Sequence, residues 1–255
     1  MSRREVDRMP KIYLSPSTQE WNPYVTGTGS EEYWMNLLAD ELEPYLYANA
    51  IAFVRNRPEM TAASSIAQAE QIGGFDFYLA LHSNASGAGQ AGKNRGIIVF
   101  YYPTSEAGKR AAGLFAAQLK KVYPLPELVT TQPTTALGEV RRPSCPANLI
   151  EIAYHDNAAD ARWIEGSLDA IAQAIARGLC DYFGLPFFYP QTPREGVVAT
   201  AGSPLLLRAY PAIDGAVVAR IPNGASVQIY ASRDGWYSVR YGETLGYAAQ
   251  AYILA

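Results

Sequence analysis

Short apolar runs alternate with longer amphipathic segments over the first 188 residues of the chain. The runs are rich in β-branched and aromatic residues, and uninterrupted runs of this kind are typical of strands buried on both faces of a sheet. The alternation predicts an α/β domain with a mixed, mostly parallel sheet and flanking helices. The predicted strands are Lys11–Leu14, Ile51–Val54, Phe77–Leu81, Ile97–Tyr102 and Asn148–Ile152.

Between these runs, apolar residues recur every three or four positions, which indicates helices. Met35, Leu38 and Leu42 share one helical face, and the preceding segment Thr28–Glu31 has the form of a capping box. The predicted helices are Glu31–Tyr47, Gly108–Lys121 and Ala158–Phe183.

The pattern changes near residue 190, where Pro186, Pro190 and Pro193 exclude a helix and favour a stiff linker. Beyond them, short alternating segments are separated by turn signals such as Asn223-Gly224 and Asp234-Gly235, as in a small all-β barrel. The sequence therefore predicts an α/β domain at residues 1–188, a proline-rich linker at 189–195 and a barrel at 196–255.

Composition limits the function. A hydrophobic fraction of 49% with 18% charged residues is that of a folded protein, and a net charge of −3 without a basic run argues against a nucleic-acid partner. No apolar stretch approaches the roughly 20 residues that span a bilayer, and no secretory signal is recognisable, so the export route stays open. Cys145 and Cys180 form no CxxC pair, and a disulfide between them remains an alternative.

The chain has two histidines, His82 and His155, and both follow predicted strand ends. In open α/β sheets, sites form beyond the carboxyl ends of strands, so both imidazoles could enter one crevice. Taken alone, each could equally be an ordinary structural histidine.

Three segments carry a more specific signal: FDFYLALHSNA, GSEEYWMNLLADEL and CPANLIEIAYHDN. Through them, residues 11–182 resemble the zinc-dependent N-acetylmuramoyl-L-alanine amidases, which cut the amide between N-acetylmuramic acid and L-alanine in peptidoglycan. The resemblance implies that His82 and Glu32 bind zinc and that Glu151 is the catalytic base. Helical periodicity alone does not choose between Glu31 and Glu32, and Glu32 at a helix start could instead serve the helix dipole.

One zinc ligand of that family has no counterpart, because Thr18 stands where a histidine of a Gly-His-Gly turn is expected. Catalytic zinc normally keeps three protein ligands, so the site needs a substitute. His155 is the favoured substitute as the remaining imidazole, and Gln19 and Glu20 are weaker alternatives on the first loop.

The C-terminal segment resembles bacterial SH3 domains through its GWYSVRY segment and its closing tyrosine. The resemblance implies binding of cell-wall peptides by aromatic rings, although the same rings could fill the barrel core. The candidate wall-binding residues are Trp236, Tyr237, Tyr247 and Tyr252, with Tyr210 a further available ring.

The expected function is therefore that of a zinc-dependent peptidoglycan hydrolase that acts on peptidoglycan and muropeptides at the bacterial cell wall. One alternative is a metal-free, catalytically silent wall-binding protein that retains the amidase fold. Another is a zinc carboxypeptidase acting on the stem peptide.

Overall fold

The computed structural model describes residues 8–255, which form two compact units. One unit comprises residues 11–42 and 53–182 and contains the mixed sheet. The other groups residues 43–52 with residues 183–255 and contains an antiparallel sheet.

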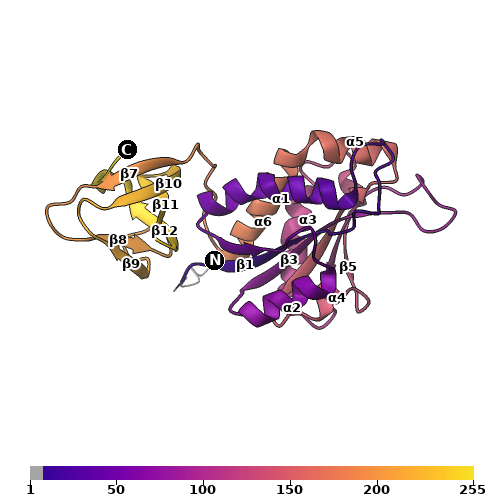
Figure 1. Ribbon diagram of the computed structural model, residues 1–255, viewed down its shortest axis with the longest axis horizontal. Helices are drawn as coiled ribbons and strands as arrows, with labels where there is room; N and C mark the ends of the chain where they lie inside the picture. The colour runs from indigo at the N-terminus through magenta and orange to yellow at the C-terminus, as the bar shows by residue number, and fades with distance from the viewer. Residues whose placement is uncertain (1–7) are drawn as a thin grey trace. The chain divides into compact units, whose positions relative to one another are not determined.

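The mixed sheet has six strands in the order β2-β1-β3-β6-β4-β5 (Figure 1). β1, β3 and β6 run parallel to one another, β4 is antiparallel to β6, and β5 is parallel to β4. This confirms the predicted fold class. The strands are β1 (Lys11–Pro16), β2 (Ala52–Arg55), β3 (Phe77–Asn84), β4 (Ile97–Tyr101), β5 (Val129–Pro133) and β6 (Ala147–Tyr154).

The helices flank this sheet, with α2 and α4 on one side and α1 and α6 on the other (Figure 1). The predicted helix 158–183 is two helices, because the chain leaves helical geometry at Ser167, directly after Gly166. The helices are α1 (Glu31–Ala48), α2 (Ala62–Ile72), α3 (Glu106–Leu119), α4 (Gly138–Arg141), α5 (Ala158–Gly166) and α6 (Leu168–Phe183), with a 3-10 turn at Pro126–Leu128.

The two faces of β3 bury different neighbours. Tyr78 and Ala80 belong to the apolar cluster that includes Ile66 of α2 and Val140 of α4. On the other face, the Phe77 ring lies 5.9 Å from that of Phe115 in α3. Since side chains alternate along a strand, His82 shares the face of Tyr78 and Ala80.

The same register aligns His82 with Glu151. These residues are Cα partners on the parallel strands β3 and β6. Each lies near the carboxyl end of its strand, where α/β folds place their sites. The sheet therefore holds these two side chains on one face.

The second unit contains a seven-stranded antiparallel sheet, consistent with the predicted SH3-like barrel. Leu207, Ile229 and Val239 are fully buried in its core. Gly246 allows a close approach, because a Cβ there would lie 2.7 Å from Leu207 Cγ. The strands are β7 (Arg194–Val198), β8 (Leu205–Arg208), β9 (Val217–Ile221), β10 (Ser226–Arg233), β11 (Trp236–Tyr241), β12 (Thr244–Ala249) and β13 (Ile253–Leu254), with a 3-10 turn at Gln250–Tyr252.

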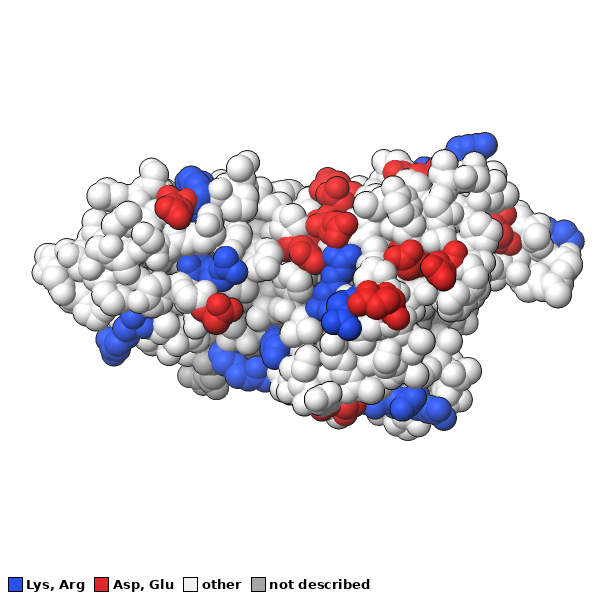
Figure 2. Space-filling view, viewed as in Figure 1, with Lys and Arg blue, Asp and Glu red and all other residues white. Residues whose placement is uncertain are grey.

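Basic and acidic side chains are interspersed on the face drawn in Figure 2. In the part of the chain that the structure describes, no helix combines the length and apolar character needed to cross a membrane. Cys145 and Cys180 are both free thiols, so the structure contains no disulfide between them.

Candidate active site

Two buried carboxylates hold the His82 ring, one at each nitrogen. Nδ1 lies 2.8 Å from Glu31 Oε1, and Nε2 lies 2.9 Å from Glu139 Oε2. All three residues are buried, with exposed fractions of 8% for His82, 2% for Glu31 and 4% for Glu139. The imidazole therefore has a fixed orientation between two acidic groups.

Glu31 is the first residue of α1, where the positive end of the helix dipole favours a carboxylate. Ser30 precedes it and accepts a hydrogen bond from the Tyr33 backbone N–H, so the helix start is capped. Asn22 donates to the second oxygen, Glu31 Oε2, at 2.8 Å. These contacts direct Glu31 Oε1 at His82.

Glu139 comes from the short helix α4, below the end of β3. Its Oε1 accepts hydrogen bonds from Ser15 at 2.6 Å and from Tyr78 at 2.8 Å, which leaves Oε2 for His82. Asn56 in turn donates to Ser15 Oγ and to the Pro16 carbonyl. The sequence patterns do not single out Glu139. The one feature that points to it is an acidic residue in the otherwise apolar segment Leu-Gly-Glu-Val.

Glu151 lies beside His82 in the sheet, and its Oε2 is buried with no hydrogen-bond partner in residues 8–255. Burial raises the pKa of Glu151 to about 7, with the nearby His82 charge acting in the opposite direction. A buried carboxylate oxygen without a partner is costly, which marks a functional candidate.

The same environment couples Glu31 and His82. Burial by itself would raise the pKa of Glu31, but the hydrogen bond and the charge of His82 hold this pKa below its ordinary value. Burial likewise opposes charge on His82, and its bonds to Glu139 and Glu31 nevertheless raise its pKa well above the usual range. As it stands, the cluster favours an imidazolium between two carboxylates.

Glu31, and not Glu32, contacts His82. Glu31 continues the buried stripe of Met35, Leu38 and Leu42, at spacings of four and then three residues. Glu32 is only partly buried, and its Oε1 lies 3.4 Å from the Asn36 side-chain amide. The helical stripe could have distinguished these two residues, because only Glu31 is in phase with it.

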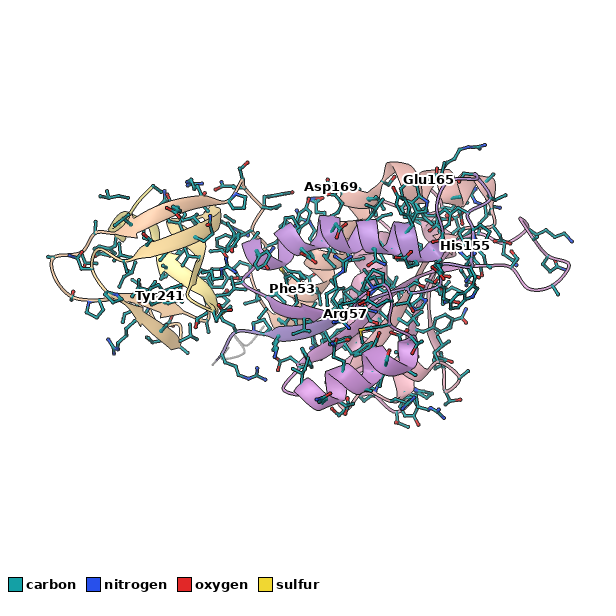
Figure 3. The ribbon with its side chains drawn as sticks, in the orientation of Figure 1. Phe53, Arg57, His155, Glu165, Asp169 and Tyr241 are labelled. Atoms are coloured by element: carbon teal, nitrogen blue, oxygen red, sulfur yellow. The ribbon has the colours of Figure 1, made fainter. Side chains whose placement is uncertain are left out.

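His155 is held elsewhere, at the end of the domain where α1 begins (Figure 3). Its Nδ1 donates to the Ser83 backbone carbonyl at 2.9 Å, and its ring stacks on Tyr24 at 5.4 Å. The Tyr24 hydroxyl also donates to Ser83 Oγ. In the described residues, no hydrogen bond joins His155 to His82, Glu31 or Glu151.

The first loop forms one wall of a pocket that opens onto His82 and Glu139. The Gln19 amide nitrogen lies 3.4 Å from both His82 Nδ1 and Glu31 Oε1, whereas Glu20 is exposed. Trp21, at 68% exposure, lies at the pocket edge. The pocket has a volume of about 320 Å³ and is lined by Ser15, Pro16, Ser17, Thr18, Gln19, Trp21, Asn56, Thr61, Ala62, His82 and Glu139.

The candidate aromatic rings of the barrel differ in burial. Tyr237 belongs to the core, and Tyr247 is fully buried with its hydroxyl donating to the Asn49 carbonyl. Trp236 and Tyr252 instead line a pocket of about 580 Å³. This pocket also contains Arg208, Ile213, Thr200, Ala201, Ser203, Pro204, Leu205, Leu206 and Ala249.

The fold and the cluster define a class of protein: an α/β domain with a histidine–glutamate site at the carboxyl ends of its strands, followed by an SH3-like barrel. The sequence profile of the N-acetylmuramoyl-L-alanine amidases matches residues 12–181, and that of the bacterial SH3 domain matches residues 203–253. The chain belongs to the N-acetylmuramoyl-L-alanine amidase family, and this membership supports peptidoglycan amidase activity.

Solved structures share the fold at low sequence identity. The amidase AmiC2 of Nostoc punctiforme matches with a TM-score of 0.60 and 17% identity, over 69% of this chain and 97% of that one. The catalytic domain of CwlV from Bacillus (Paenibacillus) polymyxa matches at 0.59 and 19%, over 69% and 99%. The CwlD amidase of Clostridioides difficile, solved with the GerS lipoprotein, matches at 0.60 and 16%, over 69% and 98%. No curated protein matches the chain.

Proposed function

We propose that the chain is a zinc-dependent N-acetylmuramoyl-L-alanine amidase that cleaves peptidoglycan at the bacterial cell wall. The observation that carries the proposal is the grouping of Glu31, His82 and Glu151 at the strand ends of an amidase-family domain. Glu31 takes the ligand role that the sequence assigned to Glu32, because its oxygen faces the His82 ring.

The charges of the cluster fit a divalent cation. When all three are ionised, Glu31, Glu139 and Glu151 carry three negative charges around one imidazole, and an imidazolium balances only one of them. Uncompensated charge is expensive inside a protein. A divalent ion with a neutral imidazole would leave one, and imidazole nitrogen with carboxylate oxygen is a normal donor set for zinc. The donors therefore fit zinc at His82 Nδ1 and Glu31 Oε1.

Gln19 is the third donor that we propose in place of the missing histidine. In the described residues, no three His, Cys, Asp or Glu side chains form a metal site, and the Gln19 amide lies beside both His82 Nδ1 and Glu31 Oε1. A half-turn of the Gln19 amide would bring its oxygen to the position of its nitrogen, beside Nδ1 and Oε1. This turn breaks the bond from Asn22 to Gln19 Oε1 and leaves the bond from Asn22 to Glu31.

In the proposed reaction, the metal ion and the protein side chains have separate roles. Held by His82 and Glu31, zinc would supply Lewis-acid polarisation of the scissile carbonyl and would lower the pKa of a nearby water. Glu151 accepts a proton from the attacking water and returns it to the departing alanine nitrogen, because an amide nitrogen leaves only when protonated. Its partnerless Oε2 and its pKa of about 7 suit both transfers. Trp21 at the pocket edge offers an exposed ring for the substrate.

The barrel is proposed to hold the enzyme on the wall. Trp236 and Tyr252 provide aromatic faces in its pocket, and Arg208 provides a charged group for a peptide carboxylate. Tethering raises the local concentration of the catalytic domain on an insoluble substrate. Tyr237 and Tyr247 would support the barrel from within.

The test is product analysis after digestion of purified peptidoglycan by the full chain. We expect stem peptides with a free L-alanine amino terminus, with activity lost in chelator and restored by zinc. Release of D-alanine would instead indicate a carboxypeptidase. Glu151→Gln is expected to lower turnover by roughly 10²–10⁴-fold while keeping zinc bound. Near-normal turnover in Glu151→Gln would refute the role of this residue.

The second candidate is a wall-binding protein without hydrolytic activity. It is favoured by Thr18 at the expected histidine position and by the carboxylates at both nitrogens of His82. Metal analysis of protein purified without chelator separates the two candidates. A zinc-free, inactive protein that still binds sacculi would support the second one.

A further inference from the structure

We propose that Glu139 is the positioning residue that prepares His82 for a metal ion. The inference rests on the proposed function, because it concerns how the same site is built. It adds a role for a residue that neither the family resemblance nor the candidate ligand set includes. The proposal names a carboxylate on α4 that acts through His82 and does not itself bind the ion.

The two ring nitrogens of His82 face different side chains. Glu139 Oε2 lies 2.9 Å from Nε2, and Glu31 Oε1 and the Gln19 amide nitrogen face Nδ1. A neutral imidazole carries one N–H, and a carboxylate at one nitrogen retains that proton there. With its N–H on Nε2, the ring would donate to Glu139 Oε2 and present the Nδ1 lone pair to the proposed zinc beside Glu31 Oε1. A zinc ion bound to Nδ1 and Glu31 Oε1 would then take the place of the proton that joins these two atoms in the metal-free protein.

A network of hydrogen bonds holds Glu139 in place. Ser15 and Tyr78 both donate to Glu139 Oε1, and Glu139 Oε2 faces His82 Nε2. Tyr78 belongs to β3, the same strand as His82, and Ser15 belongs to the neighbouring strand β1. Both donors come from rigid elements on the face of the sheet that His82 shares. Carboxylates that orient ligating histidines in this way are a recurring feature of metal sites.

Burying the Glu139 carboxylate carries a cost in free energy. Glu139 is buried, with Ser15, Tyr78 and His82 as its hydrogen-bond partners. Burial of a carboxylate for packing alone is unfavourable. Its only cationic partner among the described residues is His82, so its effect is exerted on that ring.

The experiment measures zinc affinity of the folded full chain by competition with a chromophoric chelator. Glu139→Gln keeps the size of the side chain but can present an N–H to Nε2, which favours the wrong imidazole tautomer. We expect zinc affinity to fall by about 10–100-fold, the range for loss of a carboxylate behind a metal-binding histidine. Tyr78→Phe, which removes one donor to Glu139, should give a smaller fall in the same direction.

Asp160→Asn is the matched control. Asp160 is a buried carboxylate of the same domain, held by Arg95 and Tyr123 and not bonded to His82. It should lower the melting temperature without changing zinc affinity. A second readout is the His82 Nε2–H proton in the NMR spectrum of the zinc-loaded protein, expected to resist exchange in the wild type and to be lost in Glu139→Gln.

The outcomes separate the two proposals. Equal zinc affinity in wild type and Glu139→Gln would overturn the positioning role and leave the proposed function standing. A wild-type chain that binds no zinc would overturn the zinc-dependent function and the role of Glu139 together. Weakened binding in Glu139→Gln with unchanged binding in Asp160→Asn supports the inference.

Discussion

The choice between Glu31 and Glu32 gives the sharpest test of the site. Both residues start α1 and carry the same charge, but only Glu31 contacts His82. Glu31→Gln removes a donor from the proposed ligand set, whereas Glu32→Gln changes the same charge one residue away. The pair is therefore matched for helix position, side-chain size and net charge.

The expected effect follows from linkage between binding and folding. Zinc at 100 times its dissociation constant stabilises the native state by about 2.7 kcal/mol, which raises the melting temperature of a domain of this size by about 5–11 °C. Loss of a ligand should weaken binding by at least about 100-fold, more than a change behind the ligand. At the same zinc concentration the gain then falls to about 0.4 kcal/mol, or about 1–2 °C.

The assay is thermal unfolding of each variant with zinc and with chelator, so each variant is its own reference. This design matters because Glu31→Gln also changes the hydrogen bond to His82 and the charge of the cluster, and so alters the stability of the metal-free protein by itself. Glu32→Gln should keep the full zinc-dependent rise. A full rise in Glu31→Gln, with loss of the rise in Glu32→Gln, would refute the reasoning and return the ligand role to Glu32.

Three further predictions address the other proposed roles. His82→Ala should abolish zinc binding and activity, whereas His155→Ala should lower the melting temperature with little change in zinc affinity, as isothermal titration would measure. Trp236→Ala should reduce sacculus pull-down while cleavage of soluble muropeptides is unchanged; undiminished pull-down would argue against the barrel pocket. Asp160→Ala should cost about 1–3 kcal/mol in urea unfolding, because it leaves the buried donors Tyr123 and the Gly96 N–H without their acceptor.

Most of the mixed sheet could be predicted because its strands are apolar on both faces. β3 and β6 are almost entirely buried, and this is the condition that produces a continuous apolar run. The sequence does not predict β5 (Val129–Pro133), because only Val129 is buried and the other four residues are exposed. The strand therefore has no continuous apolar run. The sequence predicts one helix where the structure has α5 and α6. The break between them is a single non-helical residue, Ser167, and it does not interrupt the helical spacing of apolar residues.

The site was predicted in part, for a related reason. His82 and Glu151 follow apolar strands, so the pattern that locates the strands also locates them. Glu139 lies on a four-residue helix whose position depends on long-range packing against β6 and α2, which local sequence does not encode. His155 has the right residue type at a strand end, but its ring is held by Ser83 and Tyr24.

In the proposed zinc site, Gln19 would stand in for the histidine that the family resemblance places on the first loop. Replacing an imidazole by a neutral amide weakens the ligand set but leaves the charge of the ligands unchanged, since both groups are neutral. The charge balance is carried by Glu31, Glu139 and Glu151, which surround a single imidazole. Three buried carboxylates repel one another unless a cation shares their site, and the repulsion grows where water is excluded. In the proposed site, a divalent ion would therefore be held chiefly by the charge of the glutamates, and the absence of a first-loop histidine would leave that charge unchanged.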